Sequence, residues 1–499
     1  MNAVDIRQLE YTYACSDQPC IHGIDLSIEQ GSCVLLAGAS GSGKSTLLNC
    51  MNGLNPLHYG GTRSGEVRVM DREIADLQMW EISEIVGTVF QNPNTQFFQC
   101  NVEDELAFGL ECRCCSSSGI SERILAYSRR MRIYDLLHRD IFSISSGERQ
   151  RVAVAAVAAL GQDVLLFDEP SANLDPDATR DLAEVLRDLK AEGRTIIISE
   201  HRIHYLRGLV DRVIVLKDGA ITYKGSPDAL DDAEFRSDQG LRAWYYKDIE
   251  TLQTRLSDSA QPPLLSVRDV ALRMRRATPI LKAASFHAHS GECIGIAGPN
   301  GAGKTTLAKA LAGLEPKATG SVELDGLALS PRQRIGKIVY MPQQADQQLF
   351  ADSVYDELAL SMGNMPDASD YISEILSAMD LAHLADKHPH ALSGGEKQRV
   401  AIAAMVAMKP RVLMLDEPTS GMDGRRMMLF ARQMRKLTES GCAVLIITHD
   451  FEFISECCDR VVWMEDGATH AQYGQGSSDK LLNWFTRNEL ERTDALCSR

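Results

Sequence analysis

The sequence predicts an α/β fold made of two consecutive domains. One glycine-rich loop occurs twice, at residues 38–45 and again at residues 298–305. A short, continuous apolar run precedes each loop and similar runs recur further along, as is typical of buried parallel strands. At 499 residues the chain exceeds what one hydrophobic core usually spans, which favours two domains of roughly 200–250 residues.

The repeat keeps its register along the chain. Lys304 lies 260 positions after Lys44, and Gln343 lies 252 positions after Gln91. Three later pairs are each separated by 248 positions: Ser145 and Ser393, Asp168 and Asp416, and His201 and His449. Because the separation changes only by small deletions, the chain is interpreted as a tandem duplication of one nucleotide-hydrolysing unit.

Composition and charge disfavour three classes of protein: nucleic-acid-binding, membrane-spanning and secreted proteins. A formal net charge of −16 disfavours broad nucleic-acid binding, which needs a basic face. The longest apolar candidate, residues 152–160, is far shorter than the ~18–20 residues that cross a bilayer. Asp5 and Arg7 interrupt any leader-like pattern at the N-terminus. We therefore expect a soluble, cytoplasmic chain that binds no nucleic acid.

The thirteen cysteines are scattered, which predicts reduced thiols rather than a disulfide framework. Cys112, Cys114 and Cys115 form a local cluster without a second cysteine or histidine pair nearby. A metal site there is the less favoured interpretation.

The two glycine-rich loops are expected to bind the phosphates of a nucleotide. Residues 34–37 and 294–297 predict strands, and helices are expected to begin near Lys44 and Lys304. Glycines let backbone N–H groups converge on phosphate oxygens at the helix N-terminus, and the lysine reaches the β- and γ-phosphates. The predicted phosphate-binding residues are Gly38, Ser40, Gly41, Gly43, Lys44, Ser45 and Thr46, with Gly298, Asn300, Gly301, Gly303, Lys304, Thr305 and Thr306 in the second loop.

A second apolar run in each half predicts a central strand ending in an Asp-Glu pair. These runs are residues 164–167 and 412–415. Asp168 and Asp416 are expected to hold Mg²⁺ together with the hydroxyls of Ser45 and Thr305, because ligands sit at the carboxyl ends of parallel strands. Glu169 and Glu417 are expected to act as general bases on the attacking water. The alternative is that they are merely solvated carboxylates.

Two further strands are predicted at residues 195–199 and 443–448, followed by His201 and His449. A histidine in this position can contact the γ-phosphate and orient the attacking water. Single histidines are more often structural, but the matched positions of this pair favour the catalytic interpretation.

With these motifs the chain resembles a fused pair of ABC-type ATPase domains, over about residues 1–235 and 264–470. The distinguishing element is Leu-Ser-Gly-Gly-Glu at residues 392–396. The resemblance implies, for each domain, a mainly parallel core sheet, an antiparallel β subdomain and a helical signature subdomain. It also implies head-to-tail pairing of the two halves, with Lys44 facing Ser393 and Lys304 facing Ser145. It assigns ATP contacts to Ser145, Gly147, Ser393, Gly394 and Gly395, and Mg²⁺ contacts also to Gln91 and Gln343.

Within that family, residues 90–98 and 102–109, their echoes at 343–350 and 354–358, and residues 199–202 resemble the ATPases of energy-coupling factor importers. The resemblance implies ATP-driven uptake of a vitamin or transition-metal ion. The implied partners are a membrane coupling (T-type) subunit and a small substrate-binding membrane subunit, with the ATPase peripheral at the cytoplasmic face of the membrane. Phe97, Phe98, Leu349 and Phe350 are candidates for the membrane-subunit contact, or they fill the local helical subdomain.

The two predicted sites differ. Ser146 stands in the first signature where the family has glycine, so closure at the second site is expected to be looser or slower. Tyr13 lies where the family places an aromatic ring against adenine, or else it is a core residue; the matching residues 273–275 include no aromatic. We expect weaker nucleotide affinity at the second site.

The predicted boundaries are a first domain at 1–240, a linker at 241–263 that begins with an amphipathic helix over 241–256, a second domain at 264–470 and a tail at 471–499. Two other classes of protein are alternatives. Tandem ATPases of sugar importers usually have one degenerate phosphate loop, whereas both lysines and both glutamates are present here. Soluble ribosome-acting ABC proteins carry a long charged helical linker, which the segment from about 235 to 263 does not match.

Overall fold

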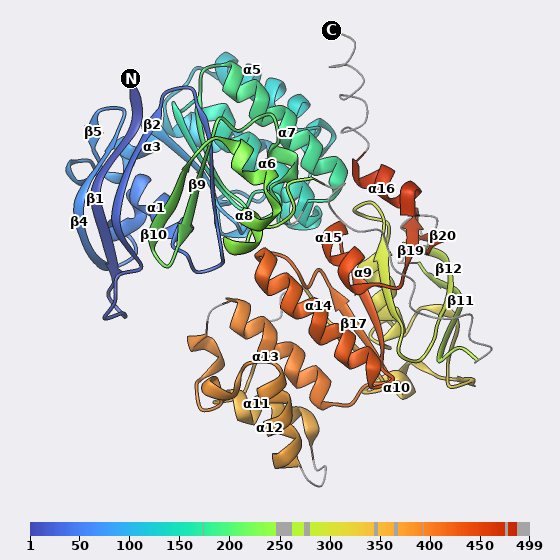
Figure 1. Ribbon diagram of the computed structural model, residues 1–499. Helices are drawn as coiled ribbons and strands as arrows, with labels where there is room; N and C mark the ends of the chain where they lie inside the picture. Colours follow the sequence, from blue (N-terminus) through green and yellow to red (C-terminus); the bar gives the residue numbers. More distant parts are fainter. Residues whose placement is uncertain are drawn as a thin grey trace. The chain divides into compact units, whose positions relative to one another are not determined.

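The computed structural model describes residues 1–172, 174–245, 262–273, 280–343, 348–363, 368–392, 394–474 and 478–486. The chain divides into two units. The first is Met1–Asp248 with Gly421–Arg425, and the second is Ile249–Ser420 with Arg426–Arg499. Each unit combines sheets with flanking helices (Figure 1), so the predicted α/β fold is confirmed.

The first unit opens with an antiparallel sheet in the order β2-β1-β4-β5. Its strands are β1 (Asn2–Tyr13), β2 (Ile21–Glu29), β4 (Gly61–Val69) and β5 (Arg72–Glu73). From Ile24 to Ile28 every second residue of β2 is buried, which is the pattern of a sheet with one face against the core. This sheet corresponds to the antiparallel subdomain that the resemblance implied.

The main sheet of the first unit has the order β10-β9-β3-β8-β7-β6 among the described strands, and only β10 runs antiparallel to its neighbour. The strands are β3 (Cys33–Gly38), β6 (Val86–Val89), β7 (Val164–Asp168), β8 (Thr195–Ser199), β9 (Arg212–Lys217) and β10 (Ala220–Gly225). The strands expected at 34–37, 164–167 and 195–199 are thus adjacent and parallel. Their carboxyl ends therefore meet at one edge of the sheet.

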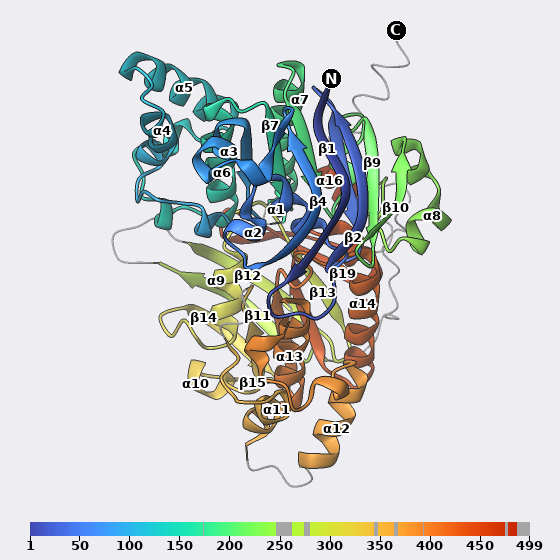
Figure 2. The ribbon, with the colours of Figure 1, turned by 90° about the vertical axis from the view of Figure 1, so that its left-hand side faces the viewer.

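Both faces of this sheet are covered, which explains its continuous apolar strands. On one face, Leu36 belongs to a buried apolar cluster that includes Ile6 of the antiparallel sheet. On the other face, its neighbour Leu35 belongs to a second buried cluster, which includes Val154 of the helix Ser146–Leu160. The helices are α1 (Lys44–Met51), α2 (Leu54–Leu57), α3 (Met79–Ile85), α4 (Val102–Cys112), α5 (Ser117–Arg130), α6 (Ser146–Leu160), α7 (Pro176–Ala191) and α8 (Ala233–Asp238). In Figure 2, α4, α5 and α6 lie together, away from β1, β2 and β4, as expected for a helical subdomain.

The second unit repeats this architecture. Its described strands form one sheet in the order β15-β14-β11-β12-β20-β19-β13-β18-β17-β16. They are β11 (Leu265–Leu272), β12 (Leu281–Ala288), β13 (Cys293–Ala297), β14 (Thr319–Leu324), β15 (Leu327–Ala328), β16 (Ile338–Met341), β17 (Val412–Asp416), β18 (Ala443–Ile447), β19 (Arg460–Glu465) and β20 (Ala468–Tyr473). The predicted strands β13, β18 and β17 are again adjacent and parallel.

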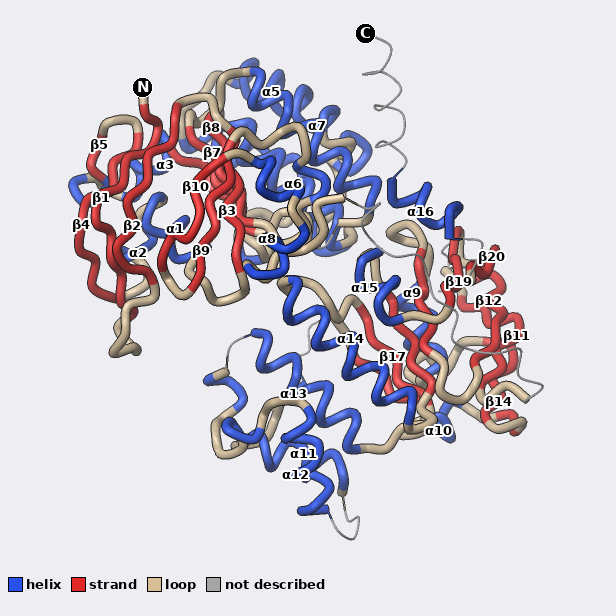
Figure 3. The backbone as a smooth tube through the Cα atoms, in the orientation of Figure 1, coloured by secondary structure: helices blue, strands red, loops and turns tan. Residues whose placement is uncertain are grey.

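Most helices of the second unit have a counterpart in the first. They are α9 (Lys304–Leu311), α10 (Pro331–Arg334), α11 (Val354–Met362), α12 (Ala368–Ala378), α13 (Gly394–Ala407), α14 (Gly424–Glu439), α15 (Phe451–Cys457) and α16 (Ser478–Thr486). Figure 3 shows α11, α12 and α13 gathered together, and they contact one another. They form the second helical subdomain.

Only part of the predicted linker lies among the described residues. Residues 241–245 are not helical, and the remainder of the helix expected over 241–256 lies outside the described residues. Trp244 is buried in the helix-side core of the first unit, which is the apolar cluster that contains Leu35 and Val154. The Tyr245 hydroxyl donates to Asp231 Oδ1 at 2.6 Å. In the predicted tail, β20 continues to Tyr473 and α16 follows, while residues 475–477 and 487–499 lie outside the described part.

Candidate nucleotide-binding sites

In both units the glycine-rich loop connects a buried strand to a helix. Gly43 precedes α1 with φ 98°, and Gly303 precedes α9 with φ 91°, a left-handed conformation that favours glycine. A Cβ atom on Gly38 would lie 2.2 Å from the carbonyl oxygen of Leu216. The loop therefore approaches the neighbouring strand too closely for any side chain at this position.

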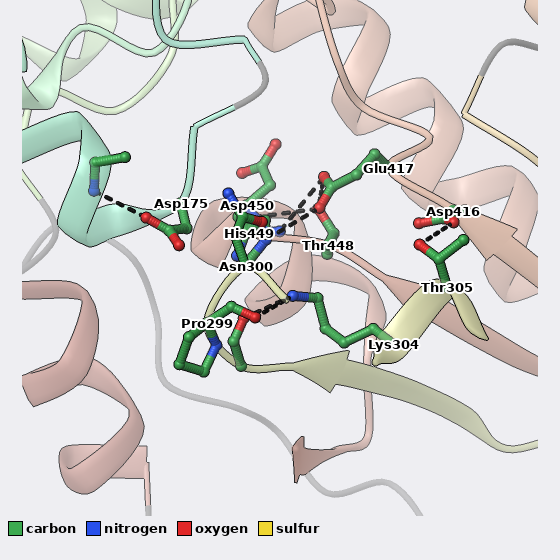
Figure 4. Close-up of polar contacts among 12 residues, drawn as sticks. Asp175, Pro299, Asn300, Lys304, Thr305, Asp416, Glu417, Thr448, His449 and Asp450 are labelled. Atoms are coloured by element: carbon green, nitrogen blue, oxygen red, sulfur yellow. Dashed lines mark hydrogen bonds and ion pairs between the residues drawn. The ribbon is translucent and has the colours of Figure 1, made fainter. Parts of the chain in front are cut away.

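The loop lysines lie across their own loops. Lys44 Nζ donates to the carbonyl oxygens of Gly38 and Ala39, each at 2.9 Å. Lys304 Nζ makes the equivalent bonds to Gly298 at 2.7 Å and Pro299 at 2.9 Å (Figure 4). Both side chains are almost fully buried. A buried ammonium group beside the N-terminus of a helix suits a phosphate anion.

The first turn of each helix contributes the predicted hydroxyls. Thr46 Oγ1 lies 3.1 Å from the Tyr13 hydroxyl and 3.2 Å from Cys20 Sγ. The Tyr13 ring is half-buried and makes an edge contact with Tyr11, so it lies next to the loop rather than deep in the core. Thr306 is half-buried in the first turn of α9. Of the stretch matching Tyr13 in the second unit, residues 274 and 275 lie outside the described residues.

The predicted magnesium ligands assemble at the ends of β7 and β17. Burial raises the pKa of Asp168, against the effect of a hydrogen bond from Ser45, and within the described residues Asp168 Oδ1 is buried without a hydrogen-bond partner. Asp416 Oδ2 accepts from Thr305 Oγ1 at 2.7 Å (Figure 4), and burial again raises the pKa of this carboxyl. Carboxylate and hydroxyl oxygens are the ligands that Mg²⁺ prefers, so these residues fit that ion.

The predicted base of the first unit is held by its neighbours. Glu169 has φ 46°, and its N–H donates to the carbonyl of Ser199 at 2.8 Å, which turns the chain sharply after β7. Its Oε2 accepts from Gln91 Nε2 at 2.8 Å, and its Oε1 lies 3.4 Å from His201 Nε2. Burial acts to raise the pKa of Glu169, but His201, Lys44 and Gln91 lower it overall. The carboxylate form, which can accept a proton from water, is thereby favoured.

The second unit has the same pair with different partners. Glu417 has φ 47°, and His449 Nε2 lies 3.6 Å from its Oε1 and 3.1 Å from Asn300 Oδ1. Thr448 Oγ1 donates to Glu417 Oε2 at 3.2 Å (Figure 4). In the first unit, the hydroxyl of Ser40 lies 3.5 Å from His201 Nε2, in the position that Asn300 takes here. Each unit thus brings its loop, base and histidine together.

The signature segments begin helices in both units. Ser145 caps α6: its N–H and hydroxyl both donate to Glu148 Oε2, and its hydroxyl accepts from the Glu148 N–H, which is a capping box. Ser146 and Gly147 follow in the first turn. Gly394 and Gly395 begin α13, whereas Ser393 lies outside the described residues. The pairing of Lys44 with Ser393 and of Lys304 with Ser145 stays a prediction.

The structure adds residues that the sequence did not single out. The Tyr340 hydroxyl donates to Asp416 Oδ2 at 3.0 Å from the neighbouring strand β16, and Thr448 contacts Glu417. The spacing of motifs along the sequence could not predict the role of Tyr340, because the pairing of β16 with β17 brings it to Asp416. Gln343 is exposed. Within the described residues no group of three or more histidine, cysteine, aspartate or glutamate residues is arranged to hold a metal ion.

The four candidates for membrane-subunit contact fall into two classes. Phe98 and Phe350 expose 75% and 78% of their surfaces, whereas Phe97 packs against the helix-side core and Leu349 is buried. A buried glutamate holds each exposed phenylalanine. Glu105 Oε2 accepts from the Phe98 N–H at 2.9 Å, and Glu357 Oε2 accepts from the Phe350 N–H at 2.8 Å.

Comparison with known proteins identifies the family. The sequence pattern described as ABC transporter matches residues 21–172 and 281–420, more than half of the chain. The chain belongs to the ABC transporter family. It is an ATPase with two tandem domains of this ATP-binding family.

The relatives include a Treponema denticola protein that is provisionally named an ABC transporter ATP-binding protein. It is 38% identical over 474 residues, covering 93% of this chain and 96% of the relative. A Bacillus subtilis protein, provisionally named the HMP/thiamine import ATP-binding protein YkoD, is 33% identical over 493 residues, covering 92% of this chain and 89% of the relative.

Solved structures show a similar fold. A structure of ribosome-bound archaeal Pelota and ABCE1 contains a chain that matches with a TM-score of 0.70 and 23% identity, covering 95% of this chain and 80% of that one. A structure entitled RNase-L Inhibitor matches with a TM-score of 0.64 and 23% identity, covering 95% and 92%. At this identity the match shows the fold alone.

Proposed function

We propose that this ABC ATPase powers a membrane importer of the energy-coupling factor type, which takes up a vitamin or a transition-metal ion. The observation that carries the proposal is the equivalent presentation of Phe98 and Phe350. Both are large apolar side chains left in solvent while buried glutamates hold their backbone. Aromatic side chains are enriched at protein–protein interfaces relative to the rest of the surface. The provisional name of the Bacillus subtilis relative, HMP/thiamine import ATP-binding protein, also supports it.

ATP would bind with its phosphates on the glycine-rich loops, against Lys44 and Lys304. Mg²⁺ would be held by the hydroxyls of Ser45 and Thr305 with Asp168 and Asp416, and would neutralise developing charge on the phosphates. Glu169 would take a proton from the attacking water while His201 holds that water and the γ-phosphate in line, since the two side chains lie 3.4 Å apart.

The partners proposed are a membrane coupling subunit and a small substrate-binding membrane subunit, with the ATPase at the cytoplasmic face of the membrane. Among the described ranges, no helix is both long and apolar enough to span a bilayer. The two halves are proposed to pair head to tail within one chain.

The test is an affinity purification of the tagged full-length chain from gently solubilised membranes of its host, with mass spectrometry of the proteins that copurify. We expect a helical coupling subunit and a small multi-span membrane protein, whose identity would point to the substrate. Recovery of ribosomes, or of permeases with a periplasmic sugar-binding protein, would contradict the proposal and support the corresponding alternative.

A further inference from the structure

Directly before His201 lies a buried carboxylate, Glu200, to which the ATPase mechanism above gives no role. It is 3% exposed, and both its oxygens are fully engaged. Oε1 accepts from the backbone N–H groups of His201 at 2.8 Å and Arg202 at 3.2 Å. Oε2 accepts from the N–H of Ser171 at 3.2 Å and from the Tyr205 hydroxyl at 3.0 Å. One carboxylate therefore joins two separate backbone segments.

The second of these segments is the turn that follows Glu169. The N–H of Ala172 donates to the carbonyl of Glu169 at 3.2 Å, which closes the turn. The Arg202 guanidinium donates to the carbonyl oxygens of Ser171 and, at 2.8 Å, of Ala172. Glu200 thus holds the N–H side of the turn and Arg202 holds its carbonyl side. We call this arrangement the Glu200–Arg202 bracket.

The bracket joins the backbone segments that carry the two side chains proposed to act on the attacking water. Glu169 begins the turn that the bracket holds, and His201 is anchored by its own N–H to Glu200. Their side chains lie 3.4 Å apart. Hydrogen bonds from several backbone N–H groups hold a buried carboxylate in one geometry, so the backbone segments that carry Glu169 and His201 cannot move apart without breaking bonds in the interior.

We propose that Glu200 is a positioning residue for ATP hydrolysis in the first unit, which holds Glu169 and His201 in line with the water through the turn at Ser171. This inference rests on the roles proposed above for Glu169 and His201, and it is independent of the importer proposal. Misplacement of catalytic groups by about 1 Å costs up to roughly 100-fold in rate, so a bracket of this kind has a measurable kinetic consequence.

In the described part of the second unit, different residues stand at these positions and make another contact. Thr448 and Asp450 occupy the positions equivalent to Glu200 and Arg202. Thr419 Oγ1 donates to Asp450 Oδ2 at 2.8 Å. This side-chain hydrogen bond joins the turn that follows Glu417 to the segment that contains His449. Thr448 Oγ1 donates directly to the carboxylate of Glu417. The repeat therefore preserves the base and the histidine but not the groups that position them.

The test is the Glu200→Gln variant of the full-length chain in a Glu417→Gln background, so that turnover reports on the first unit. A glutamine has one acceptor oxygen, so its NH₂ group must face either the His201 side or the Ser171 side, donor against donor. We expect kcat to fall by about 10- to 100-fold. The KM and the equilibrium affinity for ATP should stay within about twofold, because the phosphate loop is untouched. The matched control is Glu192→Gln, a partly exposed glutamate paired with Arg130, for which kcat should not change.

A transplant distinguishes positioning from mere support of the fold. Glu200→Thr alone should lose as much activity as Glu200→Gln. Adding Arg202→Asp to Glu200→Thr creates the residue pair found in the second unit, and kcat should then rise about fivefold over Glu200→Thr, a non-additive effect. The inference is overturned if Glu200→Gln keeps kcat within twofold, or if kcat, ATP affinity and melting temperature fall together. If Glu169→Gln itself retains turnover in the same background, the proposed base is wrong, which is a separate failure.

Discussion

At the scale of single residues, the two units use the same reactive groups with different neighbours. Asp168 has a buried oxygen without a hydrogen-bond partner in the described residues, whereas Asp416 accepts from both Thr305 and Tyr340. Burial raises the pKa of both carboxyls. A carboxylate that is buried and incompletely bonded destabilises the fold in the absence of a cation, which is typical of a functional site.

A first prediction concerns the stability of the protein without nucleotide. The pKa of Asp168 is higher in the folded than in the unfolded state, so the carboxyl stabilises the fold when protonated. That contribution is lost as pH rises through the folded pKa. At neutral pH we therefore expect Asp168→Asn to raise the melting temperature by a few degrees.

Thermal unfolding without nucleotide or Mg²⁺, measured at several pH values, checks this expectation. The gain should shrink as pH falls toward the range in which Asp168 is protonated in wild-type protein. Asp163→Asn, at an exposed carboxylate before the same strand, is the control and should change little. A lower melting temperature for Asp168→Asn at neutral pH would show that its charge is compensated.

At the scale of elements, the beginnings of α4 and α11 are built alike. The buried carboxylates of Glu105 and Glu357 each accept two backbone N–H groups from the preceding segment, at 2.8–2.9 Å. Burial raises the pKa of Glu105. The hydrogen bonds that each carboxylate accepts offset the cost of burying it. They also fix the backbone of Phe98 and Phe350, so less entropy is lost there when a partner covers these residues.

A second prediction follows for partner binding. In Phe98→Ser and Phe350→Ser we expect recovery of the copurifying membrane subunit to fall by about 10-fold or more, as for an interface hot spot. ATP binding should be unchanged, because neither side chain is among the predicted ATP-binding residues. Quantitative copurification from membranes measures the first effect and nucleotide titration the second.

Trp80→Ser is the matched control, since this aromatic side chain of α3 is also exposed, by 65%, but lies outside α4 and α11 and their preceding segments. Equal recovery in all three variants would mean that Phe98 and Phe350 are not part of the partner surface.

At the scale of the whole molecule, each unit carries a complete lysine, aspartate, glutamate and histidine set on its own sheet edge. One chain therefore contains the parts of two ATP sites. In the proposed head-to-tail pairing, a signature segment from the other half completes each site, and the chain contains both signature segments, at residues 144–148 and 392–396.

A third prediction concerns assembly. If the halves pair within one chain, the Glu169→Gln/Glu417→Gln variant should remain near the mass of a single chain, 55.0 kDa, when saturated with ATP and Mg²⁺. Light scattering coupled to size exclusion, at several protein concentrations, measures this. A concentration-dependent doubling of mass with ATP would show that pairing occurs between chains instead.

Much of the fold and of the candidate sites could be predicted from the sequence, because the motifs that indicate them are local. The apolar runs before Gly38 and Gly298 predicted β3 and β13, and the predicted helices begin at Lys44 and Lys304. The duplication supplied a second copy of every motif, so a chance match in one half was tested by the other. Family, fold class and ATPase activity were predicted correctly on these grounds.

The residues that hold the predicted reactive side chains in place could not be predicted from the sequence, because they depend on contacts between residues distant in sequence. Strand pairing brings Tyr340 to Asp416, and a turn after β7 brings Ser171 to Glu200, 29 positions later. Nor did the sequence separate exposed Phe98 from the half-buried Phe97 beside it. Sequence by itself determined which reactive groups this chain contains, since those rest on local motifs. Only the tertiary structure decided how each group is held, since burial and hydrogen bonding arise when separate strands pack.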